Sequence, residues 1–242
     1  MPDISVHSPT FEVVRSAERA HAALDWLDTY YSFSFADYYD PKNLNWGALR
    51  VFNDDRIAPG AGFPPHPHRD MEIVTYVISG ELAHRDSIGN QGVVGPGGVQ
   101  FMSAGTGVRH SEYNNSRRDP LHLVQMWVLP GQVGTAPSYG QRAFDENDRR
   151  NRWLTVVSGE PTTPAPIRIT QAATLRVARA EGMTISLDFA PKRYGYLFVA
   201  QGNAQANGEH LETGDSVRLY DVARLDVGGN AELVLWDLPG DS

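Results

Sequence analysis

The sequence predicts an all-β protein that contains two β-barrel units in tandem. Glycine and proline recur throughout the chain, 23 and 16 times in 242 residues, and the segments between them are short and rich in Val, Ile, Leu, Tyr and Phe. Many short strands separated by turn residues are typical of β-sandwiches and β-barrels. Helical signals are few, and two passages of the chain resemble each other, which indicates a repeated β unit.

Eight of the segments between turn residues have the β-branched and aromatic composition that strands favour. The expected strands are Ala48–Ile57, Met71–Gly80, Gly98–Ser103, His122–Val128, Met183–Phe189, Gly195–Ala200, Asp215–Tyr220 and Glu232–Asp237. Their spacing along the chain leaves room for tight turns but for few long helices.

Two segments carry helical signals. Ser16 is expected to cap a helix over Ala17–Leu24, because a serine side chain can accept a hydrogen bond from the first turn and Glu18 lies close to the helix start. The second segment, Asp145–Arg152, is polar throughout and is equally compatible with a helix and with a loop.

The repeated passages run from Tyr76 to His84 and from Tyr196 to Gln205, and each is followed by a glycine-rich turn. Both have the pattern of a buried strand, a glycine turn, an exposed strand and a second turn into another strand. A boundary between the units is expected in the Pro/Gly-rich run Leu129–Pro137. We place it after residue 135, so that the units cover residues 1–135 and 136–242.

The overall composition excludes several classes of function. The net charge of −8 argues against nucleic-acid binding, which requires a clustered basic surface. The absence of cysteine excludes disulfides, thiolate metal sites and a cysteine nucleophile. The N-terminus has neither a basic start nor an apolar run, and no stretch approaches the roughly 20 apolar residues of a membrane helix. A soluble cytoplasmic protein that does not contact membranes is expected.

Two pairs of metal-binding residue types stand about forty residues apart in the first unit. His66 and His68 form the first pair, and His110 and Glu112 form the second. Residues two apart on a strand point to the same face, so two such pairs on neighbouring strands can direct three imidazoles and a carboxylate at one point. Ligands without sulfur suit a divalent transition metal, and four protein ligands leave a coordination position open for catalysis.

Glu72 competes with Glu112 for the role of carboxylate ligand. The two-residue spacing from His110 favours Glu112. Glu72 is expected either to orient a ligand imidazole from outside the ligand set or to form a salt bridge with Arg69 or Arg109. His84 and His122 lack partners at strand spacing and are expected to be hydrogen-bonded core or pocket residues, and the second unit offers only His210.

At these motifs the sequence resembles the pirin branch of the cupin superfamily, and the resemblance covers nearly the whole chain. It rests on Trp26–Ala36, Leu49–Asp55, Pro65–Tyr76 and Met102–Glu112. The resemblance implies a bicupin, two jelly-roll barrels of which only the first holds a metal. In that family the ligands fall on His66, His68, His110 and Glu112.

Within this family, the sequence is similar to bacterial pirin-like quercetin 2,3-dioxygenases. This resemblance implies one divalent metal ion, for which we favour Fe(II) over Mn, Ni, Cu, Co or Zn. It implies a flavonol-like aromatic substrate and dioxygen, with release of carbon monoxide. Glu112 is expected to serve both as ligand and as the base that takes the proton of the flavonol 3-hydroxyl.

Two other classes of function remain open at this point. Eukaryotic pirins, which the chain also resembles, are linked to transcription-factor binding, so a metal- or redox-sensing protein with a protein partner is the main alternative. A cupin isomerase or sugar-binding protein is less favoured. Turnover with oxygen consumption separates the dioxygenase from both.

Overall fold

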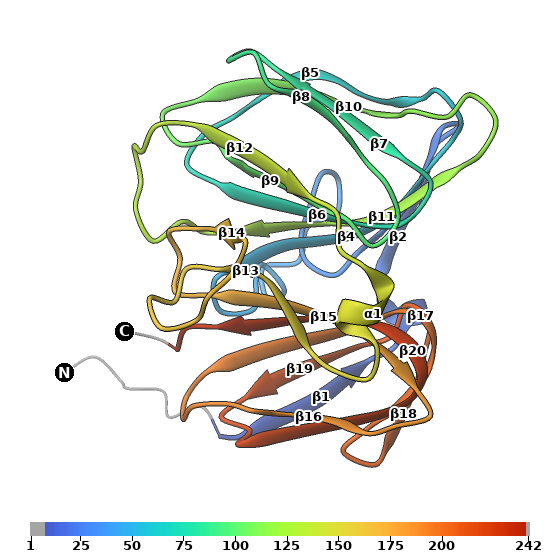
Figure 1. Cartoon of the computed structure of the whole chain (residues 1–242), viewed down its shortest axis with the longest axis vertical. Helices are drawn as coiled ribbons and strands as arrows, with labels where there is room; N and C mark the ends of the chain where they lie inside the picture. Colours follow the sequence, from blue (N-terminus) through green and yellow to red (C-terminus); the bar gives the residue numbers. More distant parts are fainter. Residues whose placement is uncertain (1–7, 241–242) are drawn as a thin grey trace.

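The computed structural model describes residues 8–240, and β-strands make up most of this range. Two units are stacked along the long axis of the molecule (Figure 1). This confirms the all-β class with two units. The strand pairings of residues 8–240 form open paths, so the units are sandwich-like and the expected barrels are not closed.

The first unit contains two facing sheets, which form the upper part of Figure 1. The larger sheet has the spatial order β12 (Ser138–Arg142), β9 (Val99–Ser103), β6 (Glu72–Ser79), β11 (Leu121–Val128), β4 (Leu49–Ile57), β3 (Leu27–Tyr31) and β2 (Ala20–Ala23). The smaller sheet has the order β5 (Gly62–His68), β10 (Val108–Asn114), β7 (Leu82–Asp86) and β8 (Gln91–Val94).

The second unit is a single folded sheet. Its main path is β1 (Thr10–Val14), β19 (Ser216–Tyr220), β17 (Tyr194–Ala206), β20 (Arg224–Leu238), β15 (Thr174–Glu181), β13 (Leu154–Ser158) and β14 (Ile167–Arg168). Two further strands, β16 (Ile185–Asp188) and β18 (Glu209–Glu212), pair with β20 and β17. The long strands β17 and β20 extend from the interface between the units to the far end of this unit (Figure 1).

All eight expected strands are present, and the internal repeat is visible in their hydrogen bonds. In the first unit the N–H of Gly97 donates to the carbonyl of Val77 at 2.8 Å, and in the second unit Gly214 donates to Val199 at the same distance. Strand β6 thus corresponds to β17, and the turn before β9 corresponds to the turn before β19.

The prediction of a helix over Ala17–Leu24 is wrong. Ser16–Glu18 form a single 3-10 turn, and the chain then enters β2, which pairs with β3. A short helix gains few hydrogen bonds for the cost of its first turn, whereas a strand beside β3 satisfies its backbone at once. In the other ambiguous segment a one-turn helix, α1 (Glu146–Arg149), forms and Asp145 caps it by accepting from the N–H of Asn147.

The two units share one hydrophobic core. The largest buried cluster contains residues of β4, β6 and β11 together with residues of β15, β17 and β20. Phe52 packs against Phe198 with ring centroids 4.9 Å apart, and the indole N–H of Trp236 lies 3.0 Å from the sulfur of Met126. Because this core crosses the interface, the units form one packed body.

Two strands connect the units in a way that the sequence did not indicate. Strand β1 comes from the start of the chain but pairs with β19 in the second unit, with Thr10 opposite Tyr220. Strand β12 follows the expected boundary at residue 135 but pairs with β9 in the first unit. Each unit therefore contains a strand from the other side of the expected division.

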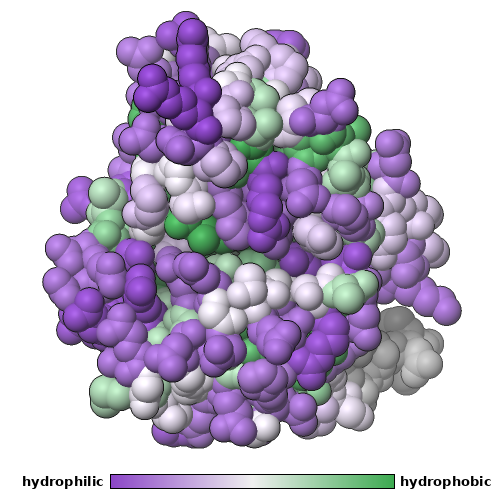
Figure 2. All heavy atoms as spheres, turned by 90° about the vertical axis from the view of Figure 1, so that its right-hand side faces the viewer, coloured by the Kyte–Doolittle hydropathy of each residue, from purple (hydrophilic) through white to green (hydrophobic). Residues whose placement is uncertain are grey.

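The surface shown in Figure 2 is predominantly hydrophilic, and its hydrophobic residues are spread over small separate areas. Within residues 8–240, none of the helices has the length and apolar character required to cross a bilayer.

Candidate metal centre

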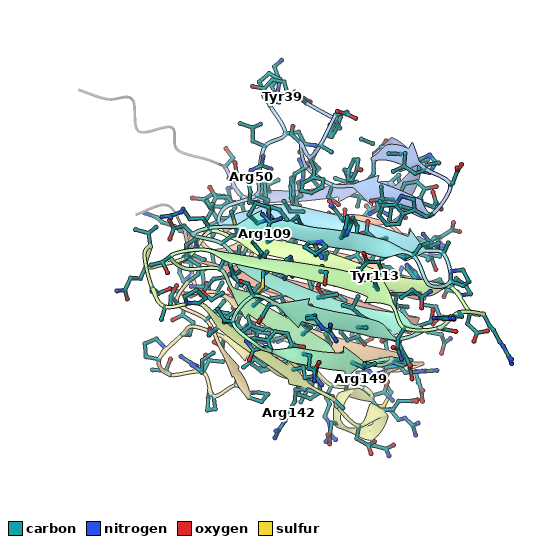
Figure 3. All side chains as sticks on the ribbon, turned by 90° about the horizontal axis from the view of Figure 1, so that it is seen from above. Tyr39, Arg50, Arg109, Tyr113, Arg142 and Arg149 are labelled. Atoms are coloured by element: carbon teal, nitrogen blue, oxygen red, sulfur yellow. The ribbon has the colours of Figure 1, made fainter. Side chains whose placement is uncertain are left out.

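Strands β5 and β10 place the two predicted pairs side by side. The strands are antiparallel, with His110 opposite His66 and Val108 opposite His68. Along β10 the side chains alternate, so His110 and Glu112 are buried while Arg109 and Tyr113 are exposed. Figure 3 looks onto this sheet from above and labels these last two residues along β10. The alternation directs the histidine and the glutamate between the two sheets.

Three histidines meet at this point. The ring centroids of His66 and His110 are 4.5 Å apart, those of His66 and His68 are 4.8 Å apart, and those of His68 and His110 are 4.9 Å apart. One nitrogen from each ring lies within 4.8 Å of the corresponding nitrogens of the others. Such a group can hold a metal ion through three imidazoles.

The hydrogen bonds of the histidines fit a metal centre. The Nδ1 of His66 lies 2.8 Å from the carbonyl oxygen of Pro64. A carbonyl only accepts, so Nδ1 carries the hydrogen and Nε2 keeps a free lone pair. The Nε2 of His110 is buried and has no hydrogen-bond partner in the structure. A buried polar atom without a partner is costly unless a ligand satisfies it.

Burial favours the neutral form of His68 and His110. Burial, together with the neighbouring His110 and His66, lowers the pKa of His68 to about 3. Burial likewise lowers the pKa of His110 to about 3, with His66 and His84 adding to the effect and Asp86 opposing it. A neutral imidazole is the form that binds a metal, so the site presents its ligands in the reactive state at neutral pH.

Glu112 is held beside the histidine cluster by two glutamines. Its carboxylate accepts hydrogen bonds from Gln100 at 2.6 Å and from Gln125 at 2.7 Å. Burial raises its pKa, while His84, Gln100 and Gln125 oppose the shift. The carboxylate belongs to a second group, with His84 and His110, in which one ligand atom per residue lies within 4.8 Å of the others. His110 is thus common to both groups.

His84 lies at the centre in spite of its isolated position in the sequence. It stands opposite Glu112 on the neighbouring strand β7, and its ring stacks on Tyr139 at 4.3 Å with an interplanar angle of 16°. His84 was not paired with any of the expected ligands, but Asp86 follows it at two-residue spacing on the same face of β7. That spacing is the signal by which His84 could have been found.

The two glutamines that hydrogen-bond to Glu112 were also not among the residues predicted for the site. Gln100 lies between Val99 and Phe101 in β9, and Gln125 lies between Val124 and Met126 in β11. An amide in an otherwise apolar strand is unusual, because a buried polar group requires a hydrogen-bond partner. Such residues mark the inner surface of a polar site.

The structure gives Glu72 partners other than an imidazole or an arginine. Its side chain is fully buried, and its carboxylate accepts from the backbone N–H of Thr170 at 2.6 Å and of Gln171 at 3.1 Å. Both belong to a loop of the second unit. Burial raises the pKa of Glu72, and these backbone hydrogen bonds partly offset the rise. In this structure Glu72 joins the two units.

Glu72→Gln is therefore expected to weaken the junction and not the centre. The amide keeps one acceptor but turns an N–H₂ group toward a backbone donor, so a buried N–H loses its partner. We expect the free energy of unfolding to fall by about 1–3 kcal/mol. Urea unfolding of metal-free protein measures this loss, and nickel titration of the folded variant should match wild type. Weakened nickel binding with unchanged stability would contradict this role.

A pair of buried aspartates lies behind the centre on β4. Asp54 lies 2.6 Å from the Nε2 of His122, which confirms His122 as a hydrogen-bonded residue. Asp55 accepts from the hydroxyl of Thr29 at 2.5 Å. Burial raises the pKa of Asp55 to about 7; the Thr29 hydrogen bond opposes the rise, whereas the charges of Asp54 and Glu112 add to it.

This raised pKa predicts a pH dependence of stability. Between about pH 4 and 7 the folded state holds a proton on Asp55 that the unfolded state has released, so a rise in pH favours unfolding. The contribution has a slope of at most about 1.4 kcal/mol per pH unit and levels off above pH 7. Asp55→Asn should remove it. Urea unfolding of metal-free protein from pH 5 to 8 should therefore show the variant gaining stability relative to wild type as pH rises; a pH-independent difference would contradict the assignment.

The groups of side chains that could hold a metal in residues 8–240 both lie in the first unit. His210 is exposed on β18, and its Nε2 lies 3.6 Å from Glu212. That the second unit binds no metal stays a prediction.

Two facing β-sheets that enclose a histidine cluster and a buried glutamate define a cupin-type protein with a group able to bind a metal. The chain belongs to the pirin family. The family model described as Pirin matches residues 12–128, and the one described as Quercetinase C-terminal cupin domain matches residues 155–238.

Similar proteins and a solved structure agree with this placement. The chain is 40% identical over 228 residues to the quercetin 2,3-dioxygenase of Escherichia coli K12, covering 93% of this chain and 97% of the relative. It is 45% identical over 216 residues to a pirin-like protein of Caulobacter vibrioides, covering 88% and 92%. The structure of the bacterial pirin YhhW of E. coli in complex with nickel(II) superposes with a TM-score of 0.89 at 38% identity, covering 96% of this chain and 100% of that one.

Proposed function

We propose that this protein is a metal-dependent dioxygenase that cleaves a flavonol such as quercetin and releases carbon monoxide. The observation that supports this most directly is the cluster of His66, His68 and His110, with a buried Nε2 that lacks a partner, beside the buried carboxylate of Glu112. The names of the E. coli relative and of the C-terminal family model support the same reaction.

The proposed ligands are His66, His68, His110 and Glu112. Three imidazoles and a carboxylate suit Fe(II), and also nickel, the metal in the YhhW complex. A bound divalent ion would supply Lewis-acid stabilisation of an anionic substrate oxygen and a place for dioxygen beside it. The chain itself would contribute three imidazoles and the buried carboxylate of Glu112.

Glu112 is the proposed base. Its raised pKa makes the carboxylate a better proton acceptor than an exposed glutamate, and the amides of Gln100 and Gln125 fix its position. A base matched to the working pH is most effective in proton transfer. The substrate hydroxyl proton would pass to a carboxylate oxygen of Glu112, and the amides would hold the group in place afterwards.

A cleft beside the cluster offers a place for the substrate. It has a volume of about 470 Å³ and is lined by residues at the ends of β5, β7 and β10, among them His68, Arg69, Ser87 and Arg109. This volume lies in the range of small-molecule sites. Arginine and serine side chains can hydrogen-bond the hydroxyl groups of a flavonol ring.

The two units have different proposed tasks. The first unit carries the metal and the reaction, and the second closes one side of the assembly through the shared core. We place the boundary after β12 rather than after residue 135, because β12 pairs with β9, and we assign β1 to the second unit.

The proposed reaction is tested by anaerobic loading with Fe(II) or Ni(II), followed by an oxygen-electrode assay with a panel of flavonols. Oxygen uptake should equal flavonol consumed, and carbon monoxide should appear in equal amount. A flavone that lacks the 3-hydroxyl is the matched control and should consume no oxygen. Metal-loaded protein that consumes no oxygen with any flavonol would contradict the proposed activity.

A further inference from the structure

His84 is not one of the proposed ligands, but its ring nitrogen Nδ1 contacts His110 of the cluster. Its Nδ1 lies 3.5 Å from the Nδ1 of His110. Its Nε2 lies 3.4 Å from a carboxylate oxygen of Asp86. The side chains of His84 and Asp86 are inaccessible to solvent. A row of three groups, Asp86 and His84 on β7 and His110 on the neighbouring β10, therefore leads to the cluster.

The groups at the two ends of this row determine which ring nitrogens of His84 and His110 carry hydrogens. The carboxylate of Asp86 already accepts from the backbone N–H groups of Ile88 and Asn90 and from the side-chain amide of Asn90. As an acceptor, it requires a hydrogen on the Nε2 of His84. A neutral His84 then has a lone pair on Nδ1, and this lone pair can only accept from an N–H on the Nδ1 of His110.

The other end of the row agrees with this assignment. When Nδ1 of His110 carries the hydrogen, its Nε2 has the free lone pair, and Nε2 is the buried atom without a partner. In His66 the Nδ1 also carries the hydrogen, because it donates to the carbonyl oxygen of Pro64. Both rings therefore present Nε2 to a metal.

We propose that His84, oriented by Asp86 and stacked on Tyr139, is a positioning residue that fixes His110 in the tautomer with Nε2 free for the metal. The inference rests on the proposed metal centre but not on the substrate or the reaction. A residue outside the ligand set that accepts from the second nitrogen of a ligand histidine fixes the ring orientation and increases metal affinity.

The stacking contact explains how His84 keeps this orientation. Its ring is parallel to Tyr139 of β12, whose hydroxyl donates to the side chain of Gln141 at 2.8 Å. Gln141 in turn donates to the backbone carbonyl of Val93 in β8. The neighbouring Gly92 has no room for a side chain, since an added Cβ would lie 2.0 Å from the Gln141 oxygen. The gap between β8 and β12 is thus filled by side chains that brace the His84 ring.

The test compares His84→Phe with His84→Asn. Phenylalanine keeps a ring to stack on Tyr139 but cannot hydrogen-bond, whereas the asparagine oxygen can still accept from His110. Nickel affinity is measured by competition with a chelator, and the tautomer of His110 by ¹⁵N NMR of metal-free protein labelled at histidine. We expect His84→Phe to weaken nickel binding by about 10- to 100-fold and to leave His110 in a mixture of tautomers. His84→Asn should restore much of both.

His21 supplies the matched control. It also stacks on a tyrosine, Tyr30, with ring centroids 4.4 Å apart, and lies 2.5 Å from Asp28, but it is exposed and outside the cluster. His21→Phe should leave nickel affinity and the His110 tautomer unchanged. Wild-type nickel affinity together with a single His110 tautomer in His84→Phe would overturn the inference. A wild-type protein that binds nickel but cleaves no flavonol would refute the proposed reaction and leave the role of His84 to be decided by the same two readouts.

Discussion

The double substitution His66→Ala/His110→Ala is expected to abolish stoichiometric metal binding and with it all flavonol turnover. It removes one ring from β5 and one from β10. The remaining His68 and Glu112 lie on different strands, and they belong to different groups of possible metal ligands. A metal that binds the folded state stabilises it by RT ln(1 + [L]/Kd), about 4 kcal/mol at a thousandfold excess over Kd. The double variant should therefore gain no thermal stability from added metal, unlike wild type.

Elemental analysis after dialysis and thermal melting with and without Ni(II) measure these effects. His210→Ala is the control, because His210 is an exposed histidine of the second unit. It should keep one metal per chain and the full rise in melting temperature. Full occupancy in the His66/His110 variant would show that the cluster is not the metal centre.

Glu112→Gln has the second-largest expected effect. The substitution keeps the size of the side chain and an acceptor oxygen but removes its charge and basicity, and one of the amides of Gln100 and Gln125 then meets another N–H₂ group. The three proposed histidine ligands should still hold a metal, so binding should be weaker but detectable. Turnover should fall by about 10²-fold or more, the contribution typical of a lost general base.

Steady-state oxygen uptake at saturating metal separates this effect from a loss of metal. The comparison with Glu72→Gln makes the test specific. Glu72 hydrogen-bonds to the second unit, so the Glu72→Gln variant should keep its metal and most of its activity. The opposite ranking, with Glu72 essential and Glu112 dispensable, would mean that Glu72 replaces Glu112 as the carboxylate ligand.

Features that follow from local periodicity could be predicted from the sequence. The alternation of strand residues predicts that His66 and His68 share a face and that His110 and Glu112 share another, and the strand pairing brings these faces together. The strands themselves follow from runs of β-branched and aromatic residues between glycines. The helix expected after Ser16 failed because a neighbouring strand, which no local pattern shows, offered its backbone better partners.

Features that depend on long-range packing could not be predicted. The carboxylate of Glu72 bonds to a loop about one hundred residues later in the chain, so its partners are invisible in the surrounding sequence. His84 reaches the cluster only because β7 lies beside β10, and Tyr139 reaches His84 only because β12 joins the first unit. In each case the tertiary pairing of strands, and not the composition of one strand, decides the contact.

The pairing of β1 with β19 has a consequence for the protein during its synthesis. Val14 is opposite Ser216, so the N-terminal strand leaves the ribosome about 200 residues before its partner. At translation rates of 5–20 residues per second this delay is roughly 10 to 40 s. During that time the segment Thr-Phe-Glu-Val-Val is an unpaired, β-prone sequence on the nascent chain. The β1–β19 pair therefore cannot form until synthesis has reached β19, so translation sets the earliest time at which this part of the second unit can be completed.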